Sequence, residues 1–582
     1  MAFKPEGWRR MKSIFLRGIF SYICLIILVL ASCSGGSSEQ TGVVDSSDNP
    51  QYGGTLTVSW AKQMNVFDGV AAGQFVGLIP KLVNQVYIGD DWSRGPAGTG
   101  EFDRLSEGTS VPDIGMGILA ESWEIPDNGT MILEVRRGVH WAMNPDSEAS
   151  VLMNGGEVIP EDWIFNHRYI NEGILAKTSG TAGTTTLEKT GDWEVTLKTV
   201  GDPQVGWAGF CGSLLLPPGV IEKYGDMQDW HNVVGTGPFM LIDFVEGNTA
   251  TLVRNPDCWE KDPVGPGKGN QLPYLDSVKI LMIADTSTIH AAFRTAQLDV
   301  LTYLTTEDAE NLMETDTRLQ YSNFVPITSP LIYIRTDKTD LPYSDKRARR
   351  AMMLAIDYRA IKDDLFGGKA SMLEYPVSSI FKNCYMPLDE MPHNVKDLFS
   401  YNKEKAVELL ADAGYPEGFD AEIILLQLNS RQLDFAQILK ETWAEVGINL
   451  KLQMVDGGAY ANMVFGRSYN ELVLCEIYGD YPRCLDFPLF GPLSLSYVND
   501  PVINNAREEI KPHFMINMPE ADRIHRELMP YIVEQAYYIP LPTAYSYNIW
   551  WPWLKNNYGE FFRFTKYFWL DQDLKQTMIG EE

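Results

Sequence analysis

The sequence lacks the short motifs with which many enzymes hold a metal ion or a nucleophile. No CxxC pair, no HxH or HExxH pattern and no GxSxG turn occurs in its 582 residues. These absences argue against a zinc ribbon, a thioredoxin-type site, a metalloprotease and an α/β-hydrolase. We therefore expect no metal site, no cofactor and no catalytic residues, and a protein that binds rather than reacts.

Basic residues are also scarce. The chain has 48 Lys and Arg against 77 Asp and Glu, which gives a formal net charge of −29. So acidic a body repels nucleic-acid phosphates and anionic lipid headgroups, so we expect no nucleic-acid partner. Apolar residues make up 45% of the chain, enough for a large globular core of several domains.

The chain has no apolar run long enough to span a bilayer comfortably as a helix. Its N-terminal run, from Ile19 to Leu30, follows basic residues at 9, 10, 12 and 17 and ends in 30–33 (LASC). A basic segment, a short apolar run and small residues before a cut are typical of a secretory signal. The small-small-Cys ending resembles a bacterial lipobox, which implies that Cys33 is lipidated and anchors an exported protein to a membrane. The alternative is an ordinary signal peptide that contains a cysteine.

Seven cysteines are present, and five of them follow Cys33. An exported protein can form disulfides, but five is an odd number and the spacing does not select pairs.

Composition changes along the mature chain. Residues 34–51 are polar and rich in Ser and Gly, as in a flexible tether, and the globular body begins at Tyr52. From there to about 300 the chain is rich in strands, including 131–135 and 193–200, with helices expected near 161–171 and 286–296.

The section from 345 to 477 has a different pattern. After a helix at 345–355, helices are expected at 402–413, 431–446 and 459–465, and strands at 422–428, 448–455 and 471–477. The last five elements predict a β-α-β-α-β unit in an open α/β sheet, whose ligands bind outside the carboxyl ends of the strands. A helix near 520–535 then leads into an extended aromatic stretch, 536–550.

Several segments, in this order, resemble the dipeptide- and oligopeptide-binding class of ABC-transporter solute-binding proteins, called family 5. Each motif is weak alone, but their collinear order covers nearly the whole mature chain. The matching segments are 53–56 (GGTL), 119–124 (LAESWE), 133–141 (LEVRRGVHW), 235–239 (GTGPF), 254–259 (RNPDCW), 297–300 (QLDV) and 347–351 (RARRA).

The resemblance implies an α/β fold: a two-lobed clamshell of the type II periplasmic-binding-protein kind, with an extra subdomain in the first lobe. The expected partners are a peptide or similar small solute, a membrane reached through the lipid anchor, and an ABC permease with its ATPase; the protein is expected to be a monomer. The expected divisions are 1–32 signal peptide, 33–51 lipidated Cys33 and tether, 52–300 lobe I with its subdomain, 301–535 lobe II and 536–582 return to lobe I.

In peptide-binding members of the family, an Asp in a "W--DY-DP" loop pairs with the α-ammonium of the ligand. Asp480 stands at the matching position in 478–483 (YGDYPR), so the resemblance implies this role, and Tyr478 and Tyr481 are candidates for lining the cleft. The alternative is that Asp480 only caps a turn before Pro482. The family's Trp before the loop and its second Asp-Pro are absent here, which weakens the match to a peptide in particular.

Two other functions stay open at this point. One is an exported carbohydrate-active hydrolase that uses two of the many acids, because the aromatic content of 12% suits sugar binding. The other is a surface receptor that uses the same fold without a transporter.

Overall fold

The computed structural model describes most of the chain after residue 48: residues 49–60, 66–72, 77–102, 115–173, 176–177, 182–200, 203–427, 429–478, 485, 489–490, 494–560 and 562–580. Its strands form three larger sheets and three two-stranded ones. No helix in this part of the chain is long and apolar enough to cross a membrane. Cys33 and the predicted signal peptide lie outside the described residues.

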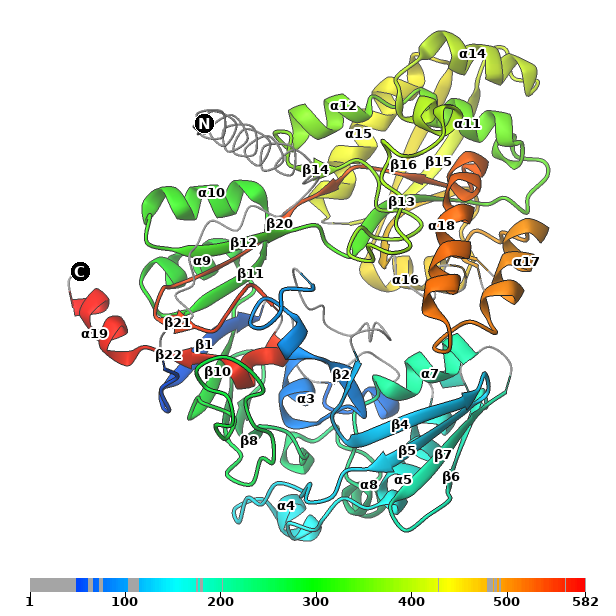
Figure 1. The fold of residues 1–582 in the computed structure, drawn as a ribbon. Helices are drawn as coiled ribbons and strands as arrows, with labels where there is room; N and C mark the ends of the chain where they lie inside the picture. The colour runs from blue at the N-terminus through cyan, green and yellow to red at the C-terminus, as the bar shows by residue number, and fades with distance from the viewer. Residues whose placement is uncertain are drawn as a thin grey trace, which may run out of the picture.

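The largest sheet has seven strands and forms the centre of lobe I (Figure 1). Its strand β1 runs parallel to β10 and β11, and Leu56 and Val58 on β1 are fully buried. Helix α9 (Thr286–Arg294) follows β10, and α10 (Thr306–Thr315) follows β11. In sheet order the strands are β12 (Gln320–Phe324), β20 (Ser546–Trp550), β11 (Val300–Leu304), β1 (Thr55–Trp60), β10 (Ser277–Met282), β9 (Thr249–Arg254) and β8 (Phe239–Val245).

An extra subdomain is inserted between β1 and β8, as the family resemblance implies. Its antiparallel sheet contains the two strands predicted at 131–135 and 193–200, and Met131, Leu133 and Val135 alternate into its core. The predicted helix at 161–171 is confirmed and begins at Pro160. The subdomain contains β4 (Ala120–Asp127), β5 (Thr130–Val135), β7 (Glu194–Thr199), β6 (Thr185–Lys189), α4 (Glu148–Met153), α5 (Pro160–Glu172), α7 (Pro203–Cys211) and α8 (Pro218–Tyr224). Nearby lie α2 (Gly69–Ala72), α3 (Leu78–Val83), β2 (Ile88–Asp90) and β3 (Gly115–Gly117).

A five-stranded sheet forms lobe II, and the predicted β-α-β-α-β unit is confirmed in it. Strands β16, β15 and β17 run parallel, and β13 lies antiparallel between β17 and β18. The strands in sheet order are β16 (Ile448–Val455), β15 (Phe419–Leu426), β17 (Leu472–Tyr478), β13 (Thr328–Ile334) and β18 (Tyr538–Pro540). The helices are α11 (Lys346–Leu354), α12 (Tyr358–Ala360), α13 (His393–Lys396), α14 (Lys403–Asp412), α15 (Ser430–Ala444), α16 (Gly457–Phe465), α17 (Pro501–Ile510) and α18 (Met518–Gln535).

Local capping explains where the helices of this unit begin and end. The side chains of Asn402 and Asn429 accept hydrogen bonds from backbone N–H groups in the first turns of α14 and α15. These N–H groups have no partner within the helix itself, so the caps stabilise the helix starts. Helix α14 ends just before Gly414, which has a φ of 95°, a conformation that glycine adopts without a side-chain clash.

The chain crosses between the two lobes twice. It leaves the seven-stranded sheet after β12 and enters lobe II at β13, and it returns between β18 and β20. A short ribbon holds the second crossing, because β19 (Thr543–Ala544) pairs with β14 (Ala370–Ser371) of lobe II. Strands β11 and β12, which begin at residue 300 or later, therefore still belong to the sheet of lobe I, and β18, which follows residue 535, still belongs to the sheet of lobe II. Both crossings thus lie later in the sequence than the boundaries predicted at 300 and 535. The reason is long-range pairing, since β11 joins β1 and β20 and no local pattern reveals those partners.

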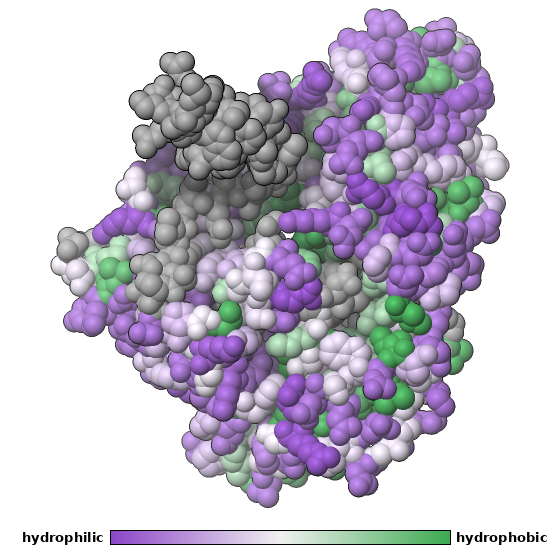
Figure 2. Space-filling model, viewed as in Figure 1, coloured by the Kyte–Doolittle hydropathy of each residue, from purple (hydrophilic) through white to green (hydrophobic). Residues whose placement is uncertain are grey.

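The subdomain also touches lobe II directly. The ring of Trp207 on α7 lies 6.0 Å from the ring of Phe514, between their centroids, and both side chains are buried. In Figure 2 a hydrophobic area lies at the right, where lobe II meets the subdomain, on an otherwise largely hydrophilic face. The two lobes therefore meet in this structure at a point other than the crossing segments.

A buried carboxylate joins the C-terminal return to the first strand. Asp299 is 0% exposed and accepts hydrogen bonds from the backbone N–H of Thr57 (2.7 Å), the indole of Trp553 (2.8 Å) and the Nζ of Lys575 (2.6 Å). Lys575 lies on α19 (Gln572–Gly580), which follows the short pair β21 (Leu554–Lys555) and β22 (Trp569–Leu570). Segments that lie 242 to 276 residues from Asp299 in the sequence are thus tied to its side chain.

We predict that Asp299→Asn lowers the free energy of unfolding by about 3 kcal/mol, because it leaves the ammonium of Lys575 without its buried counter-charge. The midpoint of urea unfolding, followed by tryptophan fluorescence, measures the loss. Asp276→Asn is the matched control, since Asp276 is 66% exposed and pairs with Arg254 at the surface; its cost should stay below about 1 kcal/mol. Equal losses in the two variants would contradict the role given to Asp299.

Candidate ligand-binding site

A cavity of about 890 Å³ lies between the two lobes. Lobe I contributes Thr305, which caps α10, and the exposed side of that helix. Lobe II contributes the end of β15, the start of α15 and Glu476 near the end of β17, while Tyr545 comes from the second crossing. The carboxyl ends of β15 and β17 thus face a cavity, as the open-sheet pattern predicts.

Acidic side chains outnumber basic ones around this cavity. Its only two cationic lining residues among those described are Lys369 and Arg431. Lys369 of lobe II forms an ion pair with Glu310 on α10 of lobe I, so this pair joins the two lobes. The acidic lining residues are Glu307, Glu310, Glu314, Asp434 and Glu476.

Arg431 and Glu476 are the uncommitted charges of opposite sign. Both are partly buried, and neither side chain has a hydrogen bond or ion pair within the described part of the chain. Arg431 lies in the first turn of α15, where the helix dipole adds to its attraction for an anion. The other unpaired acids, Glu307, Glu314 and Asp434, are exposed. The cavity therefore offers a ligand one cation and one anion that are partly buried and have no partner among the described residues.

The loop that carries the predicted ligand residues begins at this cavity. Tyr478 is the last residue of β17, and its backbone pairs with Thr328 of β13, where the chain has just entered lobe II. Asp480 and Tyr481 lie outside the described residues, so their roles stay predictions, as does that of the Tyr478 side chain. The end of β17 next to the cavity agrees with the position predicted for the loop.

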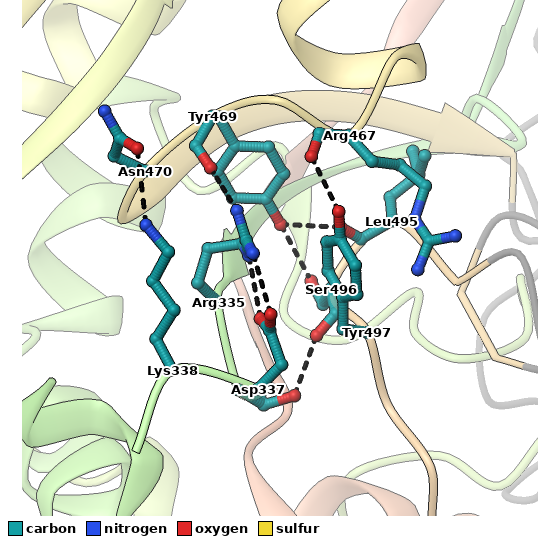
Figure 3. Close-up of polar contacts among 10 residues, drawn as sticks. Arg335, Asp337, Lys338, Arg467, Tyr469, Asn470, Leu495, Ser496 and Tyr497 are labelled. Atoms are coloured by element: carbon teal, nitrogen blue, oxygen red, sulfur yellow. Dashed lines mark hydrogen bonds and ion pairs between the residues drawn. The ribbon is translucent and has the colours of Figure 1, made fainter. Parts of the chain in front are cut away.

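The chain that follows this loop is fastened to lobe II by a dense polar network (Figure 3). The Ser496 hydroxyl accepts a hydrogen bond from the backbone N–H of Ile334 (3.1 Å), and the Ser496 carbonyl accepts one from Thr336 (2.7 Å). The Tyr469 hydroxyl donates to the carbonyl of Leu495 (2.8 Å). Both β17, before the loop, and the segment after it are thus held by the lobe II sheet and its neighbours.

Tyr497 in this network has an unfavourable backbone conformation. Its φ of 58° is in the left-handed region, which costs a side chain of this size roughly 1–3 kcal/mol. Compensation comes from its ring, which lies 4.2 Å from the guanidinium carbon of Arg335 and 3.9 Å from that of Arg467, and from a 2.7 Å hydrogen bond to the Arg467 carbonyl.

Arg335, the first of these two cations, is fixed by a carboxylate. It donates two hydrogen bonds of 2.7 Å to Asp337 and holds the pKa of that carboxyl below its usual value (Figure 3). This bidentate pair orients the guanidinium against the Tyr497 ring.

Sequence reasoning missed the charged residues that line the cavity from outside the predicted loop. Lys369, Arg431 and Glu310 come from three separate segments, and none belongs to a motif with its own spacing. Only the position of Arg431, in the first turn of a predicted helix after a predicted strand, was a local signal for an anion site.

The family model for "Bacterial extracellular solute-binding proteins, family 5 Middle" matches residues 116–486. The chain belongs to this family. Among curated proteins it is similar to the glutathione-binding protein GsiB of Salmonella choleraesuis, with 25% identity over 471 residues, which cover 76% of this chain and 84% of that protein.

Two solved structures show the same fold. The oligopeptide-binding protein AppA of Bacillus subtilis, in complex with a nonapeptide, matches with a TM-score of 0.67 and 18% identity, over 90% of this chain and 100% of that one. NikZ of Campylobacter jejuni, in complex with Ni(L-His), matches with a TM-score of 0.64 and 15% identity, over 87% and 96%. The predicted fold, a two-lobed periplasmic-binding-protein clamshell, is confirmed.

Proposed function

We propose that this family 5 protein is the lipid-anchored solute-binding component of an ABC importer, which captures a peptide or a similar small solute between its lobes and delivers it to the permease. The observation that carries the proposal is the interlobe cavity with its uncommitted Arg431 and Glu476. A clamshell that closes by hinge motion buries its ligand, so charged groups of the ligand need charged partners in the cleft.

A peptide suits this arrangement because it carries an ammonium at one end and a carboxylate at the other. Arg431 at the start of α15 is the candidate partner for the carboxylate. Asp480, which follows β17 in the sequence, is the candidate for the ammonium, together with Glu476, two residues before the end of β17. The GsiB relative is named for binding glutathione and AppA was solved with a nonapeptide, and both names describe binding rather than catalysis.

The first prediction from this proposal is that the native protein holds a solute that stabilises it. Mass spectrometry of protein purified without denaturation should reveal a bound compound, and re-adding that compound to refolded protein should raise Tm, because a ligand that binds only the folded state adds to its stability. A parallel panel of peptides, nickel chelates, oligosaccharides and amines covers the case of a ligand lost in purification. No bound compound and no shift across the panel would overturn the proposal, as would turnover of a chromogenic glycoside.

The second prediction concerns the two ends of the solute. Asp480→Asn should weaken binding of an ammonium-bearing peptide by about 1.5–3 kcal/mol, the usual worth of a hydrogen bond to a charged group. Arg431→Gln should weaken binding of a peptide with a free C-terminal carboxylate by a similar amount, and should leave binding of the C-amidated peptide unchanged. Isothermal titration calorimetry with N-acetylated and C-amidated forms separates the two effects.

Asp412→Asn is the control for these variants, because Asp412 ends α14 at an exposed position and does not line the cavity. It should leave affinity unchanged. If Asp480→Asn behaves like this control, Asp480 caps its turn and does not contact the ligand.

The third prediction concerns the anchor. Cys33→Ser should move the protein from the membrane fraction to the soluble fraction, because the sulfur that would carry the lipid is gone. Solute affinity should not change, since a tether separates Cys33 from the binding body. Cys24→Ser, inside the predicted signal peptide, is the matched control and should stay with the membrane. A Cys33→Ser protein that remains in the membrane fraction, or that binds solute less tightly, would contradict the prediction.

A further inference from the structure

One ion pair crosses the candidate ligand cavity from lobe to lobe. Glu310 lies on α10 of lobe I, and Lys369 lies directly before β14 of lobe II. Both side chains line the cavity, with 46% and 40% of their surfaces exposed. The pair therefore occupies space and charge that a bound solute would otherwise meet.

The backbone around Lys369 is fixed on its own side. The Lys369 carbonyl accepts a hydrogen bond of 3.0 Å from the backbone N–H of Tyr545, and the next two residues form the β14 ribbon with β19. Lys369 is thus attached to the second crossing, where the lobes are joined. Its ammonium group reaches from this point to α10, so the ion pair spans the cavity beside the crossing.

The two cations of the cavity are consequently not equivalent. Arg431 is available to a carboxylate, whereas a carboxylate that approaches Lys369 must first displace Glu310. It would then lie beside a second carboxylate that has lost its partner, and like charges in a partly desolvated site repel. A second anionic group on the solute therefore meets a barrier at this end of the cavity.

We propose that Glu310 is a specificity-determining residue that withholds Lys369 from the solute, so that the cavity prefers a solute with one carboxylate to one with two. This inference rests on the proposed function and names the solute class that the same cavity selects. It assigns Glu310 no contact with the preferred solute: the residue acts through Lys369.

The test compares three variants that each remove one negative charge from α10. Glu310→Gln removes the partner of Lys369. Glu307→Gln and Glu314→Gln are matched controls, since both residues lie on the same helix, line the same cavity and make no ion pair within the described residues. The probes are Ala-Ala-Ala and Ala-Ala-Glu, with dipeptide and tetrapeptide versions of the same pair, titrated calorimetrically into each protein.

Glu310→Gln should improve affinity for the peptide ending in Glu, relative to the one ending in Ala, by about three- to fivefold. The two controls should change this ratio less than twofold, because salt screens the effect of an exposed charge that is not paired with Lys369. In a Lys369→Gln background, Glu310→Gln should change the ratio no more than the controls do, because the cation that it releases is absent.

Equal ratios in all three variants, or a full effect of Glu310→Gln without Lys369, would overturn the inference and leave the proposed function intact. Failure of every peptide to bind the unaltered protein, with binding of an unrelated solute, would instead overturn the peptide class on which it rests. Unchanged Tm in Glu310→Gln shows that the altered ratio does not come from a damaged fold.

Discussion

The structure depends on one long-range pairing: strand β20, from the C-terminal part of the chain, lies between β11 and β12 in the sheet of lobe I. Its partners precede it by more than 200 residues, and all of lobe II lies between them in the sequence. The sheet of lobe I therefore cannot be completed without β20, which follows the whole of lobe II in the sequence. The buried Asp299 serves the same connection, because it ties the return segment and α19 to β1. Closing so long a loop costs conformational entropy, which the buried aromatic side chains of the return segment offset.

The same topology decides where a ligand can bind. Two crossing segments connect the sheets of the lobes, and the second is held by the β14–β19 ribbon. The carboxyl ends of β15 and β17 meet the cavity from lobe II, and α10 reaches it from lobe I. Two lobes joined only by short crossing segments are the arrangement that hinge closure requires. The contact of Trp207 with Phe514 shows that the lobes also meet away from the crossings. The proposed solute would therefore bind between two lobes that already contact each other.

The sequence was most informative where structure is local. The helix expected at 402–413 and the strand expected at 448–455 match α14 and β16 closely, because each depends on neighbours within one or two turns. Strands β11 and β12 begin at residue 300 or later but belong to the seven-stranded sheet, and only their long-range pairing reveals this. The candidate site divides in the same way. The position of the Asp480 loop after a strand could be read from the pattern, and β17 ends at Tyr478 as that reading requires. The charges of Lys369, Arg431 and Glu310 meet only in the folded chain.

Under the proposed function, charge should give the candidate cavity a selectivity that its size alone does not. The chain as a whole has a net charge of −29, and its field attracts cations and repels anions at any opening. A carboxylate enters favourably only where a local cation exceeds this background, and Arg431 at the N-terminus of α15 is the uncommitted one. An ammonium group needs no such compensation, because acidic side chains already surround the cavity. The number and sign of a solute's charges should therefore govern its affinity more strongly than its length. A cavity of about 890 Å³ has room for solutes of different length, whereas a buried charge without a partner is costly.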